Sequence, residues 1–305
     1  MSGRRAGVVV LDFARPDQAE RAAASARAGN AAVRVLVVEN AARADTPADP
    51  DHLRLRENRG FGGGMNAGLR QLLAEGCDPL LILNNDAVLE PGCLERLTGA
   101  LADASLAAVG PVILREADGR VESRGIRVDR TLGRVRLLGH GEAAPAALTG
   151  LAPVEALSGA VMLMSRHALE RVGPFDEDYF FSLEDVDWCA RARDTGFGLR
   201  VALDARARHG GSRTIGRASP DRFYYAARNH ARFLGRQRAA AGDAAGLSLA
   251  LAAGLNLAHA LAQTECPRWQ AARAVLEGIR DARRGRFGPR SAAAGPAATI
   301  PPEPT

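Results

Sequence analysis

Short apolar segments alternate with alanine-rich segments over the first third of the chain. The apolar or β-rich runs lie at residues 8–11, 33–38, 52–56 and 80–83, and helical stretches lie between them at residues 18–27 and 66–75. Such alternation requires right-handed crossovers and a parallel sheet, whose ligands gather at the carboxyl ends of the strands. The sequence therefore predicts an α/β fold with a mostly parallel sheet and a binding site along one sheet edge.

The pattern changes in the middle of the chain. Residues 107–140 break into short segments with turn signals at Ala117-Asp118-Gly119 and Leu132-Gly133, which is typical of an antiparallel hairpin insertion. A buried run at residues 157–164 is followed by helical patterns at residues 186–195, 223–238 and 244–284. We expect one α/β domain over residues 1–235, a helical extension over 236–287 and a disordered proline-rich tail over 288–305.

The basic residues of this chain are all arginines. The 305 residues are 47% hydrophobic, which fits a globular protein, and lysine is absent, so arginine supplies all 40 basic residues and a net charge of +5. Genomic composition explains this bias, although arginine forks also suit phosphates and acidic surfaces. No nucleic-acid-binding signature accompanies the charge, so we expect no nucleic-acid partner.

The cysteines show neither paired metal spacing nor a disulfide-dense pattern; they are Cys77, Cys93, Cys189 and Cys266. We expect free thiols in a reducing, cytoplasmic compartment. The apolar run after Arg4 and Arg5 ends at Asp12 and is too brief for a signal peptide.

The segment 244–262 is apolar enough to raise the question of a membrane span, but Asn256 and His259 interrupt it. Together with the arginine-rich stretch 273–286 it fits better a helix lying on the inner face of a membrane. Packing against the domain itself, or against a second subunit in a homodimer, remains an equal alternative.

Polar side chains follow the fourth strand directly. Alternation along an extended chain points Asn84 and Asp86 to the same side, and oxygen ligands at that spacing suit Mg²⁺ or Mn²⁺ bridging to a diphosphate. An Asx-type turn that merely ends the strand is the alternative for Asn84, Asn85 and Asp86. Glu39 ends another strand, where a carboxylate can accept hydrogen bonds from the imide of uracil or thymine.

A glycine-rich turn from Asn58 to Gly68 enters a helix at about Asn66. Its backbone amides can approach a phosphate or a ribose closely, although glycines needed only for close packing explain it as well. Gly62, Gly64 and Ala67 also satisfy a loose dinucleotide fingerprint, but at least two strand candidates precede them, whereas that fingerprint follows the first strand.

Glu184, Asp185 and Asp187 form an acid cluster where an apolar segment gives way to a helix. Acids are costly to bring near a core without a function, so this cluster is the first candidate for catalysis. A surface ion pair with Arg191 accounts for Asp187, whereas Asp185 has no basic partner at that spacing. His209, which precedes Gly210-Gly211-Ser212, is a candidate third metal ligand.

In combination, these motifs resemble glycosyltransferase family 2, the nucleotide-sugar-dependent enzymes of GT-A fold, and within it the rhamnosyltransferase-like branch. The resemblance covers roughly residues 8–288, and its motifs occur in the same order, including Asn58 to Gly68, Leu83 to Asp86, Gly173 to Glu177, Glu184 to Asp187, His209 to Ser212 and Arg228-Asn229.

The resemblance implies an inverting transferase with Mg²⁺ or Mn²⁺, in which Asp185, beside Glu184, is the catalytic base and Asp86, with Asn84 and His209, holds the metal. The nucleotide-sugar site would comprise Asp12, Glu39, Asn58, Gly60, Phe61, Gly62, Asn66, Asn84 and Asn85. Many relatives have aspartate at the positions of Asn84 and Glu39; the first change weakens metal affinity and the second lengthens the reach to the base.

The acceptor side would comprise Ser158, Gly159 and Trp188, although a core aromatic is the alternative for Trp188. The acceptor would be a carbohydrate, a lipid-linked molecule or a small molecule, and dTDP-rhamnose or a UDP-sugar would be the donor. We further expect Arg213, Arg217 and Arg228 to be available for a diphosphate, and residues 210–216 to close over the donor. A dinucleotide-dependent oxidoreductase and a non-catalytic carbohydrate-binding protein are the rival functions.

Overall fold

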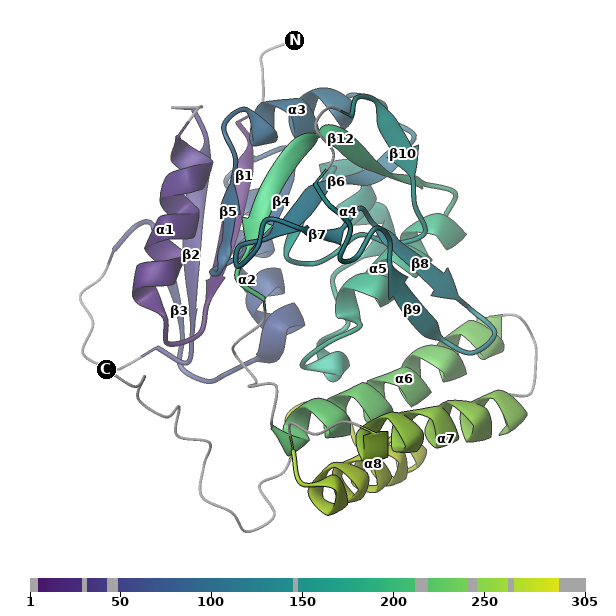
Figure 1. Cartoon of the computed structure of the whole chain (residues 1–305). Helices are drawn as coiled ribbons and strands as arrows, with labels where there is room; N and C mark the ends of the chain where they lie inside the picture. Colours follow the sequence, from purple (N-terminus) through teal and green to yellow (C-terminus); the bar gives the residue numbers. More distant parts are fainter. Residues whose placement is uncertain are drawn as a thin grey trace.

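A computed structural model describes residues 5–28, 32–42, 49–144, 148–211, 219–240, 246–262 and 266–290. A mixed sheet forms its centre, with helices on both faces and a helical layer at the carboxyl-terminal end (Figure 1). Arg213 and Arg217, and most of the expected closing segment 210–216, lie outside these residues.

The amino-terminal half of the sheet is parallel, as expected. Strands β1 (Gly7–Asp12), β2 (Arg34–Asn40), β3 (His52–Leu55) and β4 (Leu80–Asn84) pair in the order β4-β1-β2-β3. Helices α1 (Pro16–Arg27) and α2 (Gly60–Ala74) make the crossovers. Both strand faces are apolar because helices cover the sheet on both sides.

The other half of the sheet contains both parallel and antiparallel strand pairs. Strand β11 (Val161–Met164) lies antiparallel between β4 and β6 (Leu106–Arg115), and β12 (Gly198–His209) runs parallel to β6. Short strands complete this half: β5 (Ala87–Leu89) and β10 (Leu151–Pro153) pair with β12, and β7 (Val121–Ser123) pairs with β6.

Residues 107–140 are only partly the hairpin insertion that the sequence predicted. Their first part is β6, a buried ten-residue strand inside the main sheet. The antiparallel hairpin is confined to β8 (Ile126–Asp129) and β9 (Arg134–Leu137). The error arose because a strand buried on both faces lacks the alternation that distinguishes a long strand from irregular apolar sequence.

The helices divide between the two sheet faces and the terminal layer. Helices α1 and α3 (Cys93–Ala100) pack on one face, and α2, α4 (Arg166–Val172) and α5 (Glu184–Asp194) pack on the other. Helices α6 (Pro220–Ala240), α7 (Gly246–Ala262) and α8 (Arg268–Arg283) pack on one another around a third apolar cluster. The four cysteines are free and buried.

Two expected boundaries differ from the structure. The boundary at residue 235 falls inside α6, which joins the sheet domain to the terminal helices. The expected disorder from Gly288 does not hold for residues 288–290, since Gly288 N donates to Asp178 O and Arg290 N donates to the Tyr225 hydroxyl. No helix in the described ranges combines the length and apolar character needed to cross a membrane.

Candidate functional site

Strand pairing brings Asp86 and His209 together at the carboxyl edge of β4. His209 ends β12 and lies opposite Ala87 of β5, so Asp86 immediately precedes its partner. Gly210 N donates to Asp86 O at 2.9 Å, which fixes the two turns against each other. His209 Nε2 consequently lies 3.1 Å from Asp86 Oδ1.

Glu122 orients the imidazole of His209 from the opposite side. His209 Nδ1 lies 2.8 Å from Glu122 Oε1, on the neighbouring strand β7. Burial of the imidazole lowers its pKa, but the nearby carboxylates of Asp86 and Glu122 outweigh this effect and raise the pKa of His209 to about 10. No local sequence pattern points to Glu122, because only the pairing of β7 with β6 brings it to His209.

The donor set at Asp86 and His209 fits a divalent cation. His209 Nε2 is buried without a hydrogen-bond partner among the described residues, because its contact with Asp86 is close but poorly aligned. A histidine whose other ring nitrogen bonds a carboxylate is the usual arrangement for a metal ligand. The described ranges contain no larger cluster of three or more His, Cys, Asp or Glu side chains that could hold a metal.

The alternation argument for Asn84 fails. Strand β4 ends at Asn84, and Asn85 and Asp86 form a turn, so the extended geometry that would align Asn84 with Asp86 stops one residue too early. The turn interpretation is therefore correct for the backbone, although Asp86 still points to His209.

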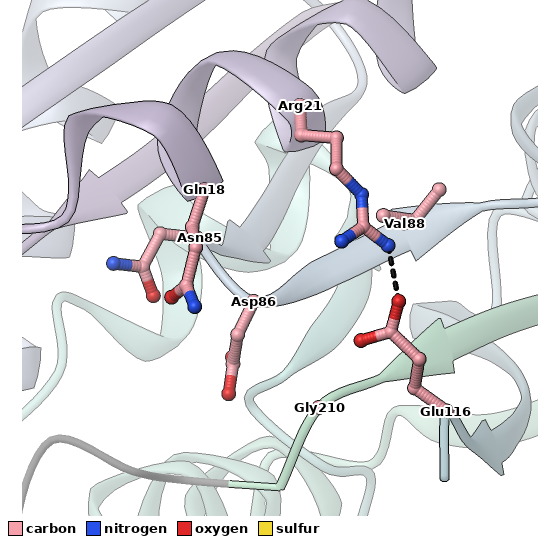
Figure 2. Close-up of a pocket in the computed structure, with 7 residues that line it drawn as sticks. All are labelled: Gln18, Arg21, Asn85, Asp86, Val88, Glu116 and Gly210. Carbon is pink, nitrogen blue, oxygen red and sulfur yellow. Dashed lines mark hydrogen bonds and ion pairs between the residues drawn. The ribbon is translucent and has the colours of Figure 1, made fainter. Parts of the chain in front are cut away.

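A polar pocket opens beside Asp86 (Figure 2). It encloses about 170 Å³ and is lined by Gln18, Arg21, Asn85, Asp86, Val88, Glu116 and Gly210. The guanidinium of Arg21 is hydrogen-bonded to Glu116 across its rim. Helix α1 and the turn after β4 thus leave a small space next to the candidate metal ligands.

Asp12 supports the turn after β4 from the end of β1. Its carboxylate is buried and accepts hydrogen bonds from Arg15 N at 2.9 Å and from Asn85 Nδ2 at 3.1 Å. Burial raises the pKa of Asp12, and these hydrogen bonds oppose the rise. The hydrogen bond between Asp12 and Asn85 therefore ties the end of β1 to the turn that carries Asp86.

Glu39 faces the edge strand rather than open solvent. Glu39 Oε1 lies 2.6 Å from His52 Nδ1, and Glu39 Oε2 accepts a hydrogen bond from Arg54 at 3.2 Å, both from β3. The side chain keeps 18% of its surface exposed, so a further hydrogen-bond acceptor position stays accessible.

The glycine-rich segment lies inside α2, which begins at Gly60 and not near Asn66 as predicted. A Cβ on Gly62 would lie 3.3 Å from Phe175, one on Gly64 would lie 2.3 Å from Leu11, and one on Gly68 would lie 2.5 Å from Val9. Close packing therefore accounts for these glycines, and the dinucleotide interpretation has lost its support.

The polar residues of this segment are bonded to the protein. Asn58 Oδ1 accepts from Gly60 N at 2.9 Å, at the start of α2. Buried Asn66 donates to Phe175 O at 2.9 Å and accepts from Phe175 N at 3.0 Å. Gly60 needs its positive φ of 69°, and Phe61 N donates to Phe180 O at 2.8 Å. These residues join α2 to the segment that precedes the acid cluster.

Asp185 lies against the loop before β11. Its Oδ2 accepts a hydrogen bond from Gly159 N at 2.7 Å, and its Oδ1 accepts one from Val186 N at 2.8 Å. The side chain is half-buried. Burial raises the pKa of Asp185, and the hydrogen bonds from Gly159 and Val186 limit that rise.

Short contacts connect Asp185 to the metal-ligand side of the site. Gly159 precedes Ala160, whose carbonyl accepts a hydrogen bond from Asn84 N at 2.9 Å. The strand end that leads to Asp86 and the loop that holds Asp185 are therefore adjacent at one edge of the sheet. Ser158, half-buried, begins the same loop and accepts from Ala160 N.

Glu184 is the most strongly perturbed carboxyl of the acid cluster. It is 5% exposed, and its Oε2 has no hydrogen-bond partner among the described residues. Burial and the adjacent charge of Asp185 raise the pKa of Glu184 to about 8. Glu184 therefore carries a proton at neutral pH, which removes one negative charge from beside Asp185.

Asp187 and Trp188 are structural. Asp187 does pair with Arg191 at 2.9 Å, but the pair is not on the surface, since Asp187 is 1% exposed and also accepts from the Tyr179 hydroxyl. Trp188 is fully buried and donates to Gly173 O at 2.9 Å. Trp188 is therefore the core aromatic of the two alternatives, because the core encloses its ring.

Helix α6 fixes the backbone that leads into the acid cluster. Phe180, Ser182 and Leu183 all have positive φ, which is costly for residues with a Cβ. Asn229 Nδ2 donates to three carbonyls of this loop, at 2.9 Å to Tyr179, 2.6 Å to Phe181 and 2.9 Å to Ser182. The strained loop is thus held in place from outside.

Arg228, the neighbour of Asn229 on α6, also bonds this loop and is not available for a diphosphate, contrary to expectation. It is fully buried, and its guanidinium donates to the carbonyls of Asp178, Tyr179 and Gly288. The sequence motif Arg228-Asn229 was correctly singled out, but its partners are the loop carbonyls and not phosphates.

Solved structures with the same arrangement are glycosyltransferases of GT-A fold. The mannosyltransferase PcManGT from Pyrobaculum calidifontis, in complex with GDP-Man and Mn²⁺, has a TM-score of 0.55 and 17% identity over 93% of this chain and 89% of that chain. GalNAc-T7 with UDP, GalNAc and Mn²⁺ has a TM-score of 0.52 and 11% identity over 75% of this chain and 51% of that one. The fold is therefore GT-A.

Sequence comparison gives the family. The glycosyltransferase-like family 2 matches residues 20–234, and the chain belongs to this family. It is 28% identical over 137 residues to the low-salt glycan biosynthesis hexosyltransferase Agl10 of Haloferax volcanii, covering 45% of this chain and 44% of that protein. It is also 28% identical over 161 residues to an uncharacterized protein of Mycobacterium tuberculosis, covering 52% of this chain and 56% of that protein. The chain thus spans about half the length of the curated relatives it matches.

Proposed function

We propose that this protein transfers a hexose from a nucleoside-diphosphate donor to an acceptor hydroxyl, with inversion at the anomeric carbon and dependence on Mg²⁺ or Mn²⁺. The observation that carries the proposal is the meeting of two groups at one sheet edge: the pair Asp86–His209 and the half-buried carboxylate of Asp185. Family membership and the GT-A fold support the same reaction class.

Asp86 and His209 would hold the metal, with Glu122 keeping Nε2 of His209 directed toward it. The bound ion supplies positive charge that stabilises the departing nucleoside diphosphate. Because the strand ends at Asn84, that residue is not aligned with Asp86, and the donor diphosphate and water would fill the remaining positions around the ion. Asp12 and Asn85 support the turn that carries Asp86, so they act on the site through its backbone.

Asp185 would accept the proton of the acceptor hydroxyl as that oxygen attacks the anomeric carbon. Its raised pKa makes it a stronger base than an exposed aspartate, and the hydrogen bond from Gly159 keeps the carboxylate in a fixed orientation. Neutral Glu184 avoids a second charge beside the base. A single displacement needs this one base and no nucleophile from the enzyme.

The donor and acceptor follow from family resemblance more than from contacts. Glu39 retains exposed surface with which to accept a hydrogen bond from a uracil or thymine imide. dTDP-rhamnose, UDP-hexoses and UDP-galactofuranose are the first donors to test, with GDP-mannose added because the mannosyltransferase neighbour was solved with it. Carbohydrate, lipid-linked and small-molecule acceptors are all compatible with the proposed base.

The test is release of nucleoside diphosphate from each donor, with and without Mn²⁺. We expect one donor to be turned over only with metal, and Asp185→Asn to lower kcat by roughly 10²–10⁴-fold with donor affinity changed by less than about threefold. Metal-independent turnover would contradict the assigned cation site. Substantial activity in Asp185→Asn would remove Asp185 from its role.

A further inference from the structure

Helix α7 turns two of its three polar residues toward the protein and exposes leucines on its outer side. Its 17 residues include no Asp, Glu, Lys or Arg. Ser248 is buried and accepts a hydrogen bond from Arg238, and Asn256 Nδ2 donates to His230 Nδ1 at 3.1 Å, so both face α6. The third polar residue, His259, is exposed, with its ring beside Phe223 of α6.

The opposite face of α7 is a stripe of exposed leucines. Leu251 is 50% exposed, Leu255 is 39% exposed and Leu261 is 45% exposed. With Ala258 they recur at the three- and four-residue spacings of one helix face. A helix that packs only on its own domain would carry polar residues there, so this face indicates contact with an apolar environment.

Helix α8, which packs on α7, adds large apolar and basic side chains. Trp269 is 66% exposed and Leu276 is 57% exposed. Arginines 268, 273, 280 and 283 are exposed on α8, and the exposed Arg284 and Arg286 follow it. These six face two acids: Glu277 pairs with Arg290 and Arg273, and Asp281 accepts from the Tyr224 hydroxyl and pairs with Arg280. The outer surface of α8 is therefore positively charged.

We propose that the outer faces of α7 and α8 dock on an anionic lipid surface. Leucines and tryptophan would enter the boundary between headgroups and acyl chains, while the arginines meet lipid phosphates. A second copy of this chain fits less well, because it would bring an equally positive α8 against the first. Helix α7 would not need to cross the membrane, since it would lie in the plane of the membrane surface.

This surface does not depend on the proposed chemistry, although α6 connects the two. One end of the connection is the contact of Asn229 with the loop before Asp185, and the other is the packing of α6 on α7 and α8. Docking would therefore hold the catalytic domain beside the lipid headgroups.

The test is co-sedimentation of the full chain with vesicles of phosphatidylcholine alone or of equal parts phosphatidylcholine and phosphatidylglycerol. We expect binding to the mixed vesicles that weakens as salt is raised. The triple variant Leu251→Gln, Leu255→Gln, Leu261→Gln should lower the affinity by about two orders of magnitude. The double variant Arg283→Glu, Arg284→Glu should lower it roughly tenfold or more.

Matched controls replace the same kinds of side chain on strands outside α7 and α8. Val135→Gln with Leu151→Gln replaces residues that are 41% and 44% exposed on β9 and β10. Arg134→Glu with Arg136→Glu makes the same change in net charge on β9. Both controls should bind vesicles like the unmodified chain, and circular dichroism checks the fold of each variant.

Three results would overturn the proposal: no binding to mixed vesicles, equal loss of binding in the controls, or a dimer of the unmodified chain that the leucine variant abolishes. The last result would assign the surface to a second copy. Release of nucleoside diphosphate measured without lipid separates this outcome from failure of the proposed reaction, since the leucine variant should leave that release unchanged.

Discussion

At the scale of single residues, the three acids of the cluster have three different environments. Glu184 is buried with an unpaired oxygen, Asp185 is half-buried with two backbone donors, and Asp187 is bonded to Arg191 and Tyr179. Sequence spacing favoured Asp185 as the candidate base, because Cys189 stands where a basic partner would neutralise it. It could not assign a charge state to Glu184, which depends on burial by the complete fold.

Glu184 should make stability depend on pH. Its pKa is raised from 4.5 to about 8 on folding, so the folded state binds more protons than the unfolded state between these values. Stability contributed by this group therefore falls as pH rises through that window. We expect Glu184→Gln to change Tm little near pH 5 and to raise it relative to the unmodified chain near about pH 9. A Tm difference that is constant with pH would contradict a protonated Glu184.

Gly159 should tolerate no side chain. A Cβ there would lie 3.1 Å from Phe61 Cζ and 3.2 Å from Asp185 Oδ2, so Gly159→Ala must displace the carboxylate. We expect a loss of about 1–3 kcal/mol in unfolding free energy and a larger proportional loss of kcat. Gly99→Ala is the control, because Gly99 lies in α3 with open space around it and should gain about 1 kcal/mol. Urea unfolding and turnover of the preferred donor measure both effects.

At the scale of elements, α6 acts as a support for the loop that leads to Asp185. One asparagine side chain holds three carbonyls of a segment with three strained residues. We expect Asn229→Ala to cost about 2 kcal/mol of stability, to increase protease cleavage in the loop and to lower kcat roughly tenfold or more.

The same substitution at Asn256 is the control for Asn229. Asn256 bonds only His230 between α7 and α6 in the described contacts, so Asn256→Ala should leave turnover unchanged. Limited proteolysis and donor turnover on both variants compare the two positions. Equal turnover losses would mean that α6 acts through general stability and not through the loop.

The local sequence pattern predicted the strands and helices, and it missed the contacts between residues that lie far apart in the chain. Strands β1, β2 and β4 were predicted because apolar runs between helical segments identify them, and their polar ends mark the site. Glycines suit both a phosphate-binding turn and close packing, so the sequence left both interpretations of the α2 glycines open. The positions of Leu11, Val9 and Phe175 show that close packing accounts for them. The bond from Asn229 to Tyr179 spans 50 residues and leaves no local signal.

At the scale of the whole molecule, the candidate site residues lie at one edge of the sheet, and the terminal helices α7 and α8 carry an exposed apolar and basic surface. The sheet brings β4, β12 and the loop before β11 to one edge, which is where the proposed site lies. The helices after residue 220 hold the loop before Asp185 on one side and expose leucine, tryptophan and arginine on the other. The fold class followed from the sequence, whereas this division of surfaces required the structure.

The central claim is that metal ligation and proton transfer belong to different residues of one site. Titration calorimetry of nucleoside diphosphate with Mn²⁺ tests it on the unmodified chain, Asp86→Asn and Asp185→Asn. We predict that Asp86→Asn loses the metal-dependent part of binding, whereas Asp185→Asn binds like the unmodified chain but releases no diphosphate from a donor sugar. Unchanged metal-dependent binding in Asp86→Asn, or its loss in Asp185→Asn, would contradict the account.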